Sequence, residues 1–148
     1  RKQYVTELKN IVVYGNGWND EKNIKIGQTK WGRSDGYSIN IMKDYTFCLI
    51  IENNNAKGYV SEKIYDVWCA GSIPLYFGNI DENMNIPSNM YIDLKKISPQ
   101  NLETHLNTLS LNDIAMMIKS INKNRENLLR KVSPKRYYNI FQEVVNKI

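Results

Sequence analysis

The chain of 148 residues has only one histidine and two cysteines. The histidine, His105, lies at the edge of a predicted helix face, so it is expected at the surface and no Ser-His-Asp catalytic set can be formed. Cys48 and Cys69 fall in apolar stretches without metal-ligand spacing, which favours reduced core thiols over a disulfide. The sequence also lacks any Asn-x-Ser/Thr acceptor site. Together these absences favour a cytoplasmic location.

Several ligand-binding patterns are missing as well. No apolar run approaches the roughly 20 residues that a membrane-spanning helix needs. There is no Walker sequence, and Gly15-x-Gly17 lacks the third glycine of a dinucleotide fingerprint. The chain has no Asp-x-Asp pair, and Asp35 and Asp81-Glu82 are isolated in loops. We therefore expect no catalytic metal and no other cofactor.

The positive charge is concentrated near the C-terminus. From residue 117 onward, eight Lys or Arg side chains stand against two Glu, a local charge of +6, whereas the whole chain carries +5. One interpretation is a solvated helical face. The alternative is contact with an anionic membrane surface or with nucleic acid.

Apolar spacing predicts strands that alternate with helices. We expect buried strands at residues 11–14, 47–51, 73–78 and 90–93, and helices at 2–9, 59–70 and 111–132, with a further helix opening at Ser98-Pro99. Ser133-Pro134 should open a last one. Residues 16–44 are predicted to form a long loop with little regular structure. The pattern predicts one α/β domain over residues 1–148, with a Rossmann-like parallel sheet and extra C-terminal helices.

Polar residues follow the second predicted strand and open the next helix. Glu52-Asn53 ends the strand, and Tyr59, Glu62 and Lys63 are expected within one helical turn. Helix N-termini in such folds bind anions at the carboxyl end of the sheet, where a lysine can neutralise a phosphate and a carboxylate can accept from ribose. The alternative is that these are ordinary first-turn charges and a plain strand end. The residues alone leave both interpretations open.

The same residues resemble the α1,3/4-fucosyltransferases of glycosyltransferase family 10. Three blocks carry the resemblance: Ile51-Glu52-Asn53, then Tyr59-Val60-Ser61-Glu62-Lys63, then the segment 70–78 with Ile73-Pro74 and Gly78. The strand that ends at Tyr14-Gly15 and the helix after Ser98-Pro99 continue it. One departure is Ile51, where the family usually has phenylalanine.

The resemblance implies the C-terminal, GDP-fucose-binding half of a GT-B enzyme, in which fucose is transferred with inversion and without a metal. By match of position, the expected donor-binding residues are Arg1 and Lys63 at the pyrophosphate, Glu62 at ribose or fucose hydroxyls, and Asn53 and Tyr59 in the donor pocket. Tyr14, Gly15 and Glu52 are further candidates. The loop from Gly15 to Trp18 would border the guanine.

The family's general base lies in an N-terminal acceptor domain that we expect to be absent here. The resemblance therefore predicts no catalytic residue in this chain, and an isolated domain that binds donor without transferring fucose. Expected partners are GDP-fucose, an oligosaccharide or polysaccharide acceptor and the acceptor domain, with peripheral contact of the basic C-terminal helices with the inner face of a membrane as a further possibility; under this interpretation no nucleic acid is expected. Two alternatives stay open: another GT-B transferase, such as an exostosin-like enzyme with a different nucleotide sugar, and a non-catalytic basic module for nucleic acid or membrane.

Overall fold

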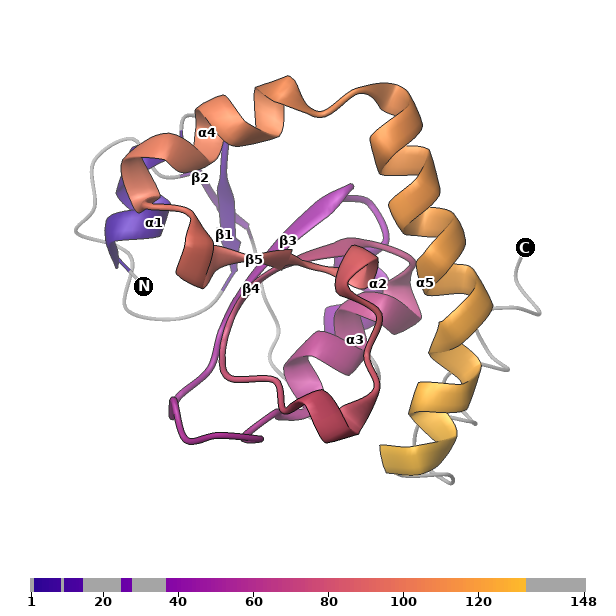
Figure 1. Cartoon of the computed structure of the whole chain (residues 1–148). Coiled ribbons are helices and arrows are strands. Elements are labelled where there is room, and N and C mark those ends of the chain that lie inside the picture. The colour runs from indigo at the N-terminus through magenta and orange to yellow at the C-terminus, as the bar shows by residue number, and fades with distance from the viewer. Residues whose placement is uncertain (1, 9, 15–24, 28–36, 133–148) are drawn as a thin grey trace.

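The computed structural model describes residues 2–8, 10–14, 25–27 and 37–132 (Figure 1). Its helices are α1 (Lys2–Glu7), α2 (Tyr37–Met42), α3 (Glu62–Ala70), α4 (Pro99–Thr108) and α5 (Leu111–Val132). Its strands are β1 (Val12–Tyr14), β2 (Lys25–Gly27), β3 (Phe47–Ile51), β4 (Ile73–Phe77) and β5 (Ile92–Asp93). Short 3₁₀ turns are η1 (Glu82–Met84), η2 (Ser88–Met90) and η3 (Leu94–Lys96).

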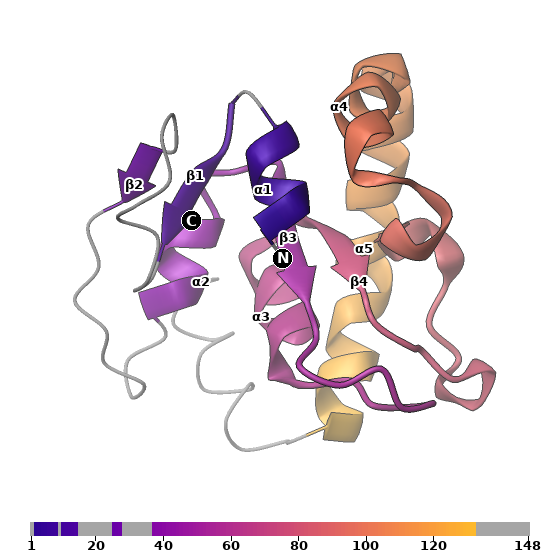
Figure 2. The same cartoon turned by 90° about the vertical axis from the view of Figure 1, so that its left-hand side faces the viewer.

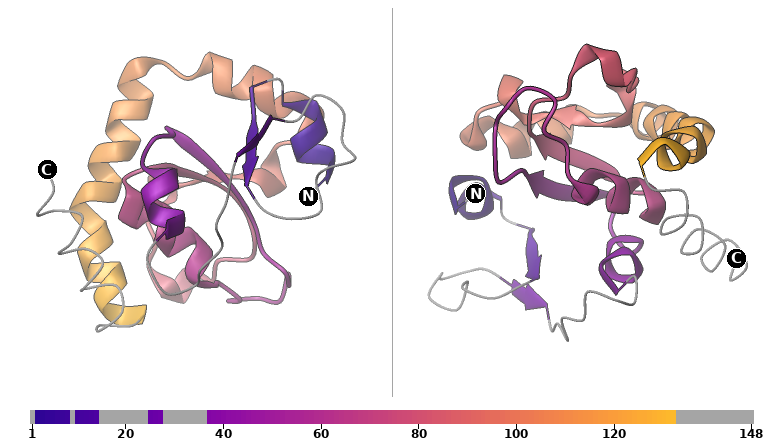
Figure 3. Two further views of the ribbon diagram at one scale, coloured as in Figure 1. Left: turned by 180° about the vertical axis from the view of Figure 1, so that it is seen from behind. Right: turned by 90° about the horizontal axis from the view of Figure 1, so that it is seen from below.

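The central sheet is parallel, with strand order β3-β4-β5. Leu49 of β3 stands opposite Leu75 of β4, which in turn stands opposite Ile92 of β5. Because all three strands run the same way, their carboxyl ends share one edge of the sheet. This arrangement confirms the predicted α/β class. β1 instead pairs with β2 in a separate two-stranded parallel sheet, which lies apart from the main one (Figures 2 and 3).

Pro74 shows how a proline fits into the middle strand of this sheet. The neighbouring Ile73 donates its N–H to Thr46 on the β3 side, so the imide nitrogen of Pro74 faces the β5 side. There β5 pairs only with Leu75 and Tyr76. The missing donor of Pro74 therefore costs no ladder hydrogen bond.

Helix α3 forms the centre of the core. Ile64, Val67 and Trp68 share one face and are fully buried, as the spacing predicts. The Trp68 indole donates to the Met90 carbonyl at 2.9 Å, which satisfies its one polar atom. The helix ends at Gly71, whose φ of 80° permits a Schellman motif in which Ser72 N–H donates to the Val67 carbonyl. The predicted stop at Gly71 is confirmed.

The remaining helices surround the sheet. α1 packs against α4, and the Tyr4 hydroxyl donates to the carbonyls of Leu94 and Ile97 at 2.8 and 2.9 Å. α4 begins with Pro99 at its first turn after Ser98, as predicted. α5 covers the predicted residues and packs on α3; in Figure 1, α4 runs across the top of the view and α5 down its right-hand side. None of the described helices is long and apolar enough to cross a membrane.

Two predicted boundaries are wrong. Residues 16–44 are not simply a loop, because the described part contains β2 and α2. α2 is too short for its periodicity to stand out, and it forms because it packs on α3 and buries Ile39 to 2% exposure. The fourth strand is only Ile92–Asp93, because η2 occupies its expected start. The prediction for Ser133-Pro134 lies outside the described residues.

Candidate functional site

Glu52 is a buried carboxylate at the carboxyl end of β3. Its side chain is 1% exposed. One oxygen, Oε1, accepts from the Ser61 N–H at 2.9 Å and from the Tyr76 hydroxyl at 3.0 Å, and Oε2 accepts from the Ser61 hydroxyl at 2.7 Å. The Lys63 ammonium lies 3.6 Å from Oε2. A carboxylate removed from water needs such partners, so these contacts determine how the strand end is joined to α3.

Ser61 connects this carboxylate to the first turn of α3. It is the N-cap residue, and its Oγ accepts from the Lys63 backbone N–H at 3.4 Å. The same oxygen accepts from Lys63 Nζ at 3.0 Å. Lys63 keeps 31% of its side chain exposed. Its ammonium is therefore oriented by the cap and still accessible at the positive end of a nine-residue helix.

Tyr76 completes the buried network from β4. Burial, with Glu52 beside it, raises the pKa of Tyr76 far above its ordinary value, so the hydroxyl remains a donor to the carboxylate. Its ring lies over Gly78, where an added Cβ would overlap the hydroxyl and the ring edge. Only glycine at position 78 leaves room for the ring in this orientation.

The loop between β3 and α3 is fastened to the segment after β4. Gly58 N–H donates to the Asn79 carbonyl at 2.8 Å, and the Asn79 amide donates to the Asn55 carbonyl at 3.3 Å. Lys57 and Asp81 add an ion pair at 3.5 Å. The loop therefore follows the carboxyl edge of the sheet on which the site is built.

The structure brings Asn53, Glu62 and Lys63 to this edge, but it corrects the position of Tyr59. α3 begins at Glu62 because Ser61 is extended, with φ −88° and ψ 178°, and acts as its cap. Tyr59 precedes the cap, 39% exposed, and is not in one helical turn with Glu62 and Lys63 as predicted. Asn53 and Glu62 are exposed. Their contact with a donor stays a prediction.

The N-terminal candidates are only partly described. Tyr14 ends β1, and its hydroxyl lies 2.7 Å from the hydroxyl of Tyr45. Arg1, Gly15 and Trp18 lie outside the described residues. α1, which follows Arg1 in the chain, places the Tyr4 ring 6.2 Å from Phe77, the last residue of β4.

Sequence reasoning gave no role to Ser61, Tyr76 or Gly78. A serine that directly precedes Glu-Lys at a helix start is a cap signal, and it could have been used. The hydrogen bond from Tyr76 to Glu52 joins residues 24 positions apart. No local pattern indicates it.

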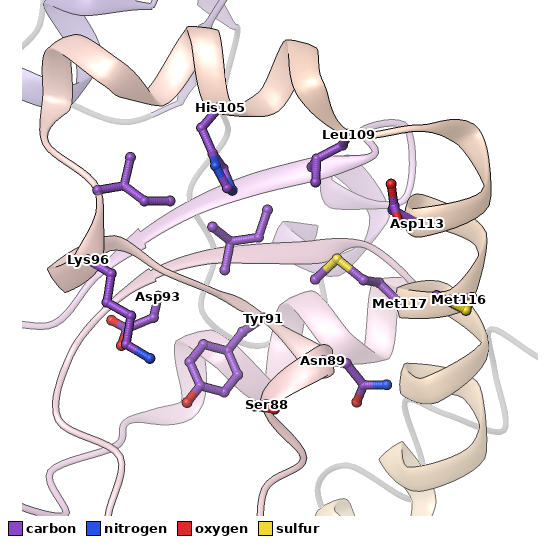
Figure 4. Close-up of a pocket in the computed structure, with 12 residues that line it drawn as sticks. Ser88, Asn89, Tyr91, Asp93, Lys96, His105, Leu109, Asp113, Met116 and Met117 are labelled. Carbon is purple, nitrogen blue, oxygen red and sulfur yellow. The ribbon is translucent and has the colours of Figure 1, made fainter.

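A pocket of about 590 Å³ opens elsewhere, between β5, α4 and α5 (Figure 4). His105 lines it from α4, Leu109 from the residue directly after α4, and Asp113 and Met117 from α5. None of the predicted donor-binding residues that the structure describes is among its lining residues. Across the described ranges, no group of three or more His, Cys, Asp or Glu side chains could hold a metal ion.

Comparison with known proteins identifies the family. Residues 1–119 match the sequence model of the C-terminal part of glycosyltransferase family 10 (fucosyltransferase). The chain belongs to this family. The match includes β3, α3 and β4, and so the whole Glu52 network.

Three curated fucosyltransferases are among the similar proteins. The chain is 35% identical to the alpha-(1,4)-fucosyltransferase of Arabidopsis thaliana over 50% of its own length, and 29% identical to alpha-(1,3)-fucosyltransferase C of Drosophila melanogaster over 61%. It is 28% identical to the GDP-fucose protein O-fucosyltransferase 3 of Xenopus tropicalis over 76%. These matches span only 19%, 19% and 25% of the respective relatives. No solved structure gave a significant match.

Proposed function

We propose that this family 10 chain is the donor-binding domain of a fucosyltransferase, which takes L-fucose from GDP-fucose and passes it to a glycan acceptor. One observation carries the proposal. The structure fixes the Lys63 ammonium through Ser61 and the buried Glu52 at the N-terminus of α3. A helix N-terminus with an oriented, accessible cation suits a diphosphate. The printed name of the Xenopus relative names GDP-fucose, which supports this donor.

The chemistry follows from where charge develops. When the sugar leaves, negative charge grows on the diphosphate, and a positive side chain at that place stabilises the leaving group. Lys63 supplies such a charge, and Arg1 is proposed as its partner. We propose that transfer inverts the anomeric carbon and needs no catalytic metal or other cofactor. Undiminished transfer by the full-length enzyme in EDTA would agree with this, whereas restoration by a divalent cation would contradict it.

The chain spans a fifth to a quarter of the curated relatives it matches, so activity is proposed for a longer protein. The acceptor domain, in a GT-B arrangement, would supply the general base. We propose that the 148-residue chain binds donor without turnover; fucose transfer by the chain alone would contradict this. Its oligosaccharide or polysaccharide acceptor, its cytoplasmic location and its peripheral membrane contact are proposals of the same kind.

Titration calorimetry with GDP, GDP-fucose, UDP and CMP tests the donor. We expect GDP and GDP-fucose to bind more tightly than UDP or CMP. Tighter binding of UDP would contradict the GDP assignment and favour the second candidate, a GT-B transferase of the exostosin type that uses another nucleotide sugar.

The Lys63→Ala variant tests the phosphate contact. Losing a hydrogen bond to a charged group costs about 1.5–3 kcal/mol, or roughly ten- to a hundredfold in Kd for GDP. Binding of guanosine, which has no phosphate, should change little. Lys119→Ala is the matched control, because it removes the same charge from an exposed position on α5. Equal losses for GDP and guanosine would argue against a phosphate contact.

A non-catalytic module for nucleic acid or membrane would rest on the basic residues near the C-terminus. Its binding should then fall steeply with salt and be lost when residues after Val132 are removed. GDP binding that survives the same truncation separates the two functions.

A further inference from the structure

Every hydrogen bond at the buried Glu52 carboxylate is donated to it, and this determines which hydrogen bonds the Ser61 hydroxyl can make. Glu52 is surrounded by donors: the Ser61 N–H, the Ser61 hydroxyl and the Tyr76 hydroxyl. An ionised carboxylate only accepts, so the proton of the Ser61 hydroxyl must point at Oε2, 2.7 Å away. Both lone pairs of Oγ then face away from Glu52.

Those lone pairs meet two donors from one residue. Lys63 directs its backbone N–H at Oγ from 3.4 Å and its ammonium from 3.0 Å. The serine oxygen is therefore fully used, with one bond donated and two accepted. The ammonium, 3.6 Å from Oε2 as well, is held on the side of the helix start that remains open to solvent.

We propose that Glu52 and Ser61 are positioning residues that act through Lys63: the carboxylate fixes the serine proton, and the serine oxygen in turn holds the ammonium where a diphosphate is bound. The inference rests on the proposed function, since it needs an anionic ligand at Lys63. Glu52 itself then makes no contact with the donor, in agreement with its 1% exposed side chain.

Substitutions at position 61 separate the hydroxyl from the rest of the side chain. Ser61→Thr keeps the hydroxyl and the cap, so its affinity for GDP should match that of the original chain. Ser61→Ala removes the acceptor of the ammonium and should weaken GDP binding about three- to tenfold, the range of one hydrogen bond. Guanosine binding should not change in either variant.

Glu52→Gln tests the direction of the hydrogen bonds. The amide oxygen takes the place of Oε1, which receives two donors, so the amide NH₂ faces Ser61 Oγ. Three donors then converge on an oxygen with two lone pairs, and the ammonium is displaced. GDP affinity should fall as in Ser61→Ala, although the side chain keeps its size.

A double-mutant cycle distinguishes positioning from general damage. Ser61→Ala and Glu52→Gln are each introduced into the original chain and into the Lys63→Ala variant. Each resulting chain is titrated with GDP and with guanosine. If the two residues act through Lys63, neither change weakens GDP further once Lys63 is alanine. A loss that persists in the Lys63→Ala background, or an equal loss for guanosine, would overturn the inference.

A measurement without nucleotide separates this inference from the proposed function. In proton–nitrogen NMR of the unliganded chain, a hydrogen-bonded Lys63 ammonium should give a slowly exchanging signal that Ser61→Thr keeps and that Ser61→Ala and Glu52→Gln abolish. A signal unaffected by Ser61→Ala would overturn the positioning. If the signal behaves as expected but the original chain binds no GDP, the proposed function fails, and the proposed role in diphosphate binding fails with it.

Discussion

At the scale of single residues, the site depends on how closely Tyr76 approaches Gly78. The Tyr76 hydroxyl reaches Glu52 only because its ring lies over a residue without a side chain. A methyl group at position 78 would push the ring away and deprive the buried carboxylate of one donor. Two effects would then add, steric overlap and a weakened hydrogen bond.

We therefore predict that Gly78→Ala lowers the free energy of unfolding by about 1–3 kcal/mol, the usual cost of overpacking. Urea unfolding followed by circular dichroism measures this. The matched control is the same change in a Tyr76→Leu background, where the ring is gone and the added cost of alanine should be smaller. An equal cost in both backgrounds would show that Tyr76 is not the residue that alanine displaces.

The sequence predicted some of these residue roles and not others. Glu52 directly follows the apolar run of β3, and Lys63 lies in the first turn of the predicted helix, so the sequence indicates both as candidate site residues. Their connection through Ser61 is only partly local, and the contribution of Tyr76 comes from a neighbouring strand. Burial of Glu52 is a property of the packed sheet, so a sequence pattern cannot separate a carboxylate that binds ligand from one that holds the site together.

At the scale of elements, α3 is defined by its two caps. Ser61 begins it and Gly71 ends it, and both boundaries come from local geometry. A Cβ at Gly71 would lie 3.9 Å from the nearest atom, Arg125 Nη1, which is ordinary contact. Any cost of a side chain there is therefore conformational and comes from the φ of 80°.

We predict that Gly71→Ala destabilises the chain by about 1 kcal/mol, because alanine resists the left-handed region. Gly71→Asn should cost less, since asparagine adopts that region more readily. Thermal or urea unfolding of both variants measures the difference. If asparagine proves as costly as alanine, the cap conformation is not the cause.

Elements with strong local signals could be predicted, and the weak ones could not. β3, α4 and α5 follow the expected residues because apolar spacing and a proline at N1 mark them. Apolar spacing does not predict α2, because six residues give too little periodicity and its stability comes from packing on α3. The spacing predicts too early a start for α3, since Tyr59 and Val60 continue it but precede the cap.

At the scale of the whole molecule, one core joins the sheet to the helices around it; the Cys69 thiol lies in this core, and the half-buried Cys48 packs against it. Cys48 and Cys69 are both free, as expected from the sequence. The order of the strands could not be predicted, because β1 had the same apolar character as β3 yet pairs with β2. Which strands pair is decided by long-range packing, which apolar spacing along the chain does not reveal.

The two thiols predict how the free energy of unfolding depends on pH. Burial raises the pKa of Cys48 to about 11 from 9.0, and burial, with Asp66 nearby, raises the pKa of Cys69 to about 12. The folded chain thus holds these protons at a pH where the unfolded chain releases them. The contribution of the two thiols to the free energy of unfolding is fully present below pH 9 and is lost as the pH rises toward 11 and 12.

Between pH 9 and 10 the two thiols should together lower the free energy of unfolding by about 2 kcal/mol. Urea unfolding at both pH values measures the decline, and the Cys48→Ala, Cys69→Ala double variant is the control. Tyr4, Tyr65, Tyr76 and Tyr91 also have raised pKa values, but their ordinary value of 10.0 places most of their effect above this window. A decline that is just as steep without the cysteines would assign the alkaline loss to the tyrosines instead.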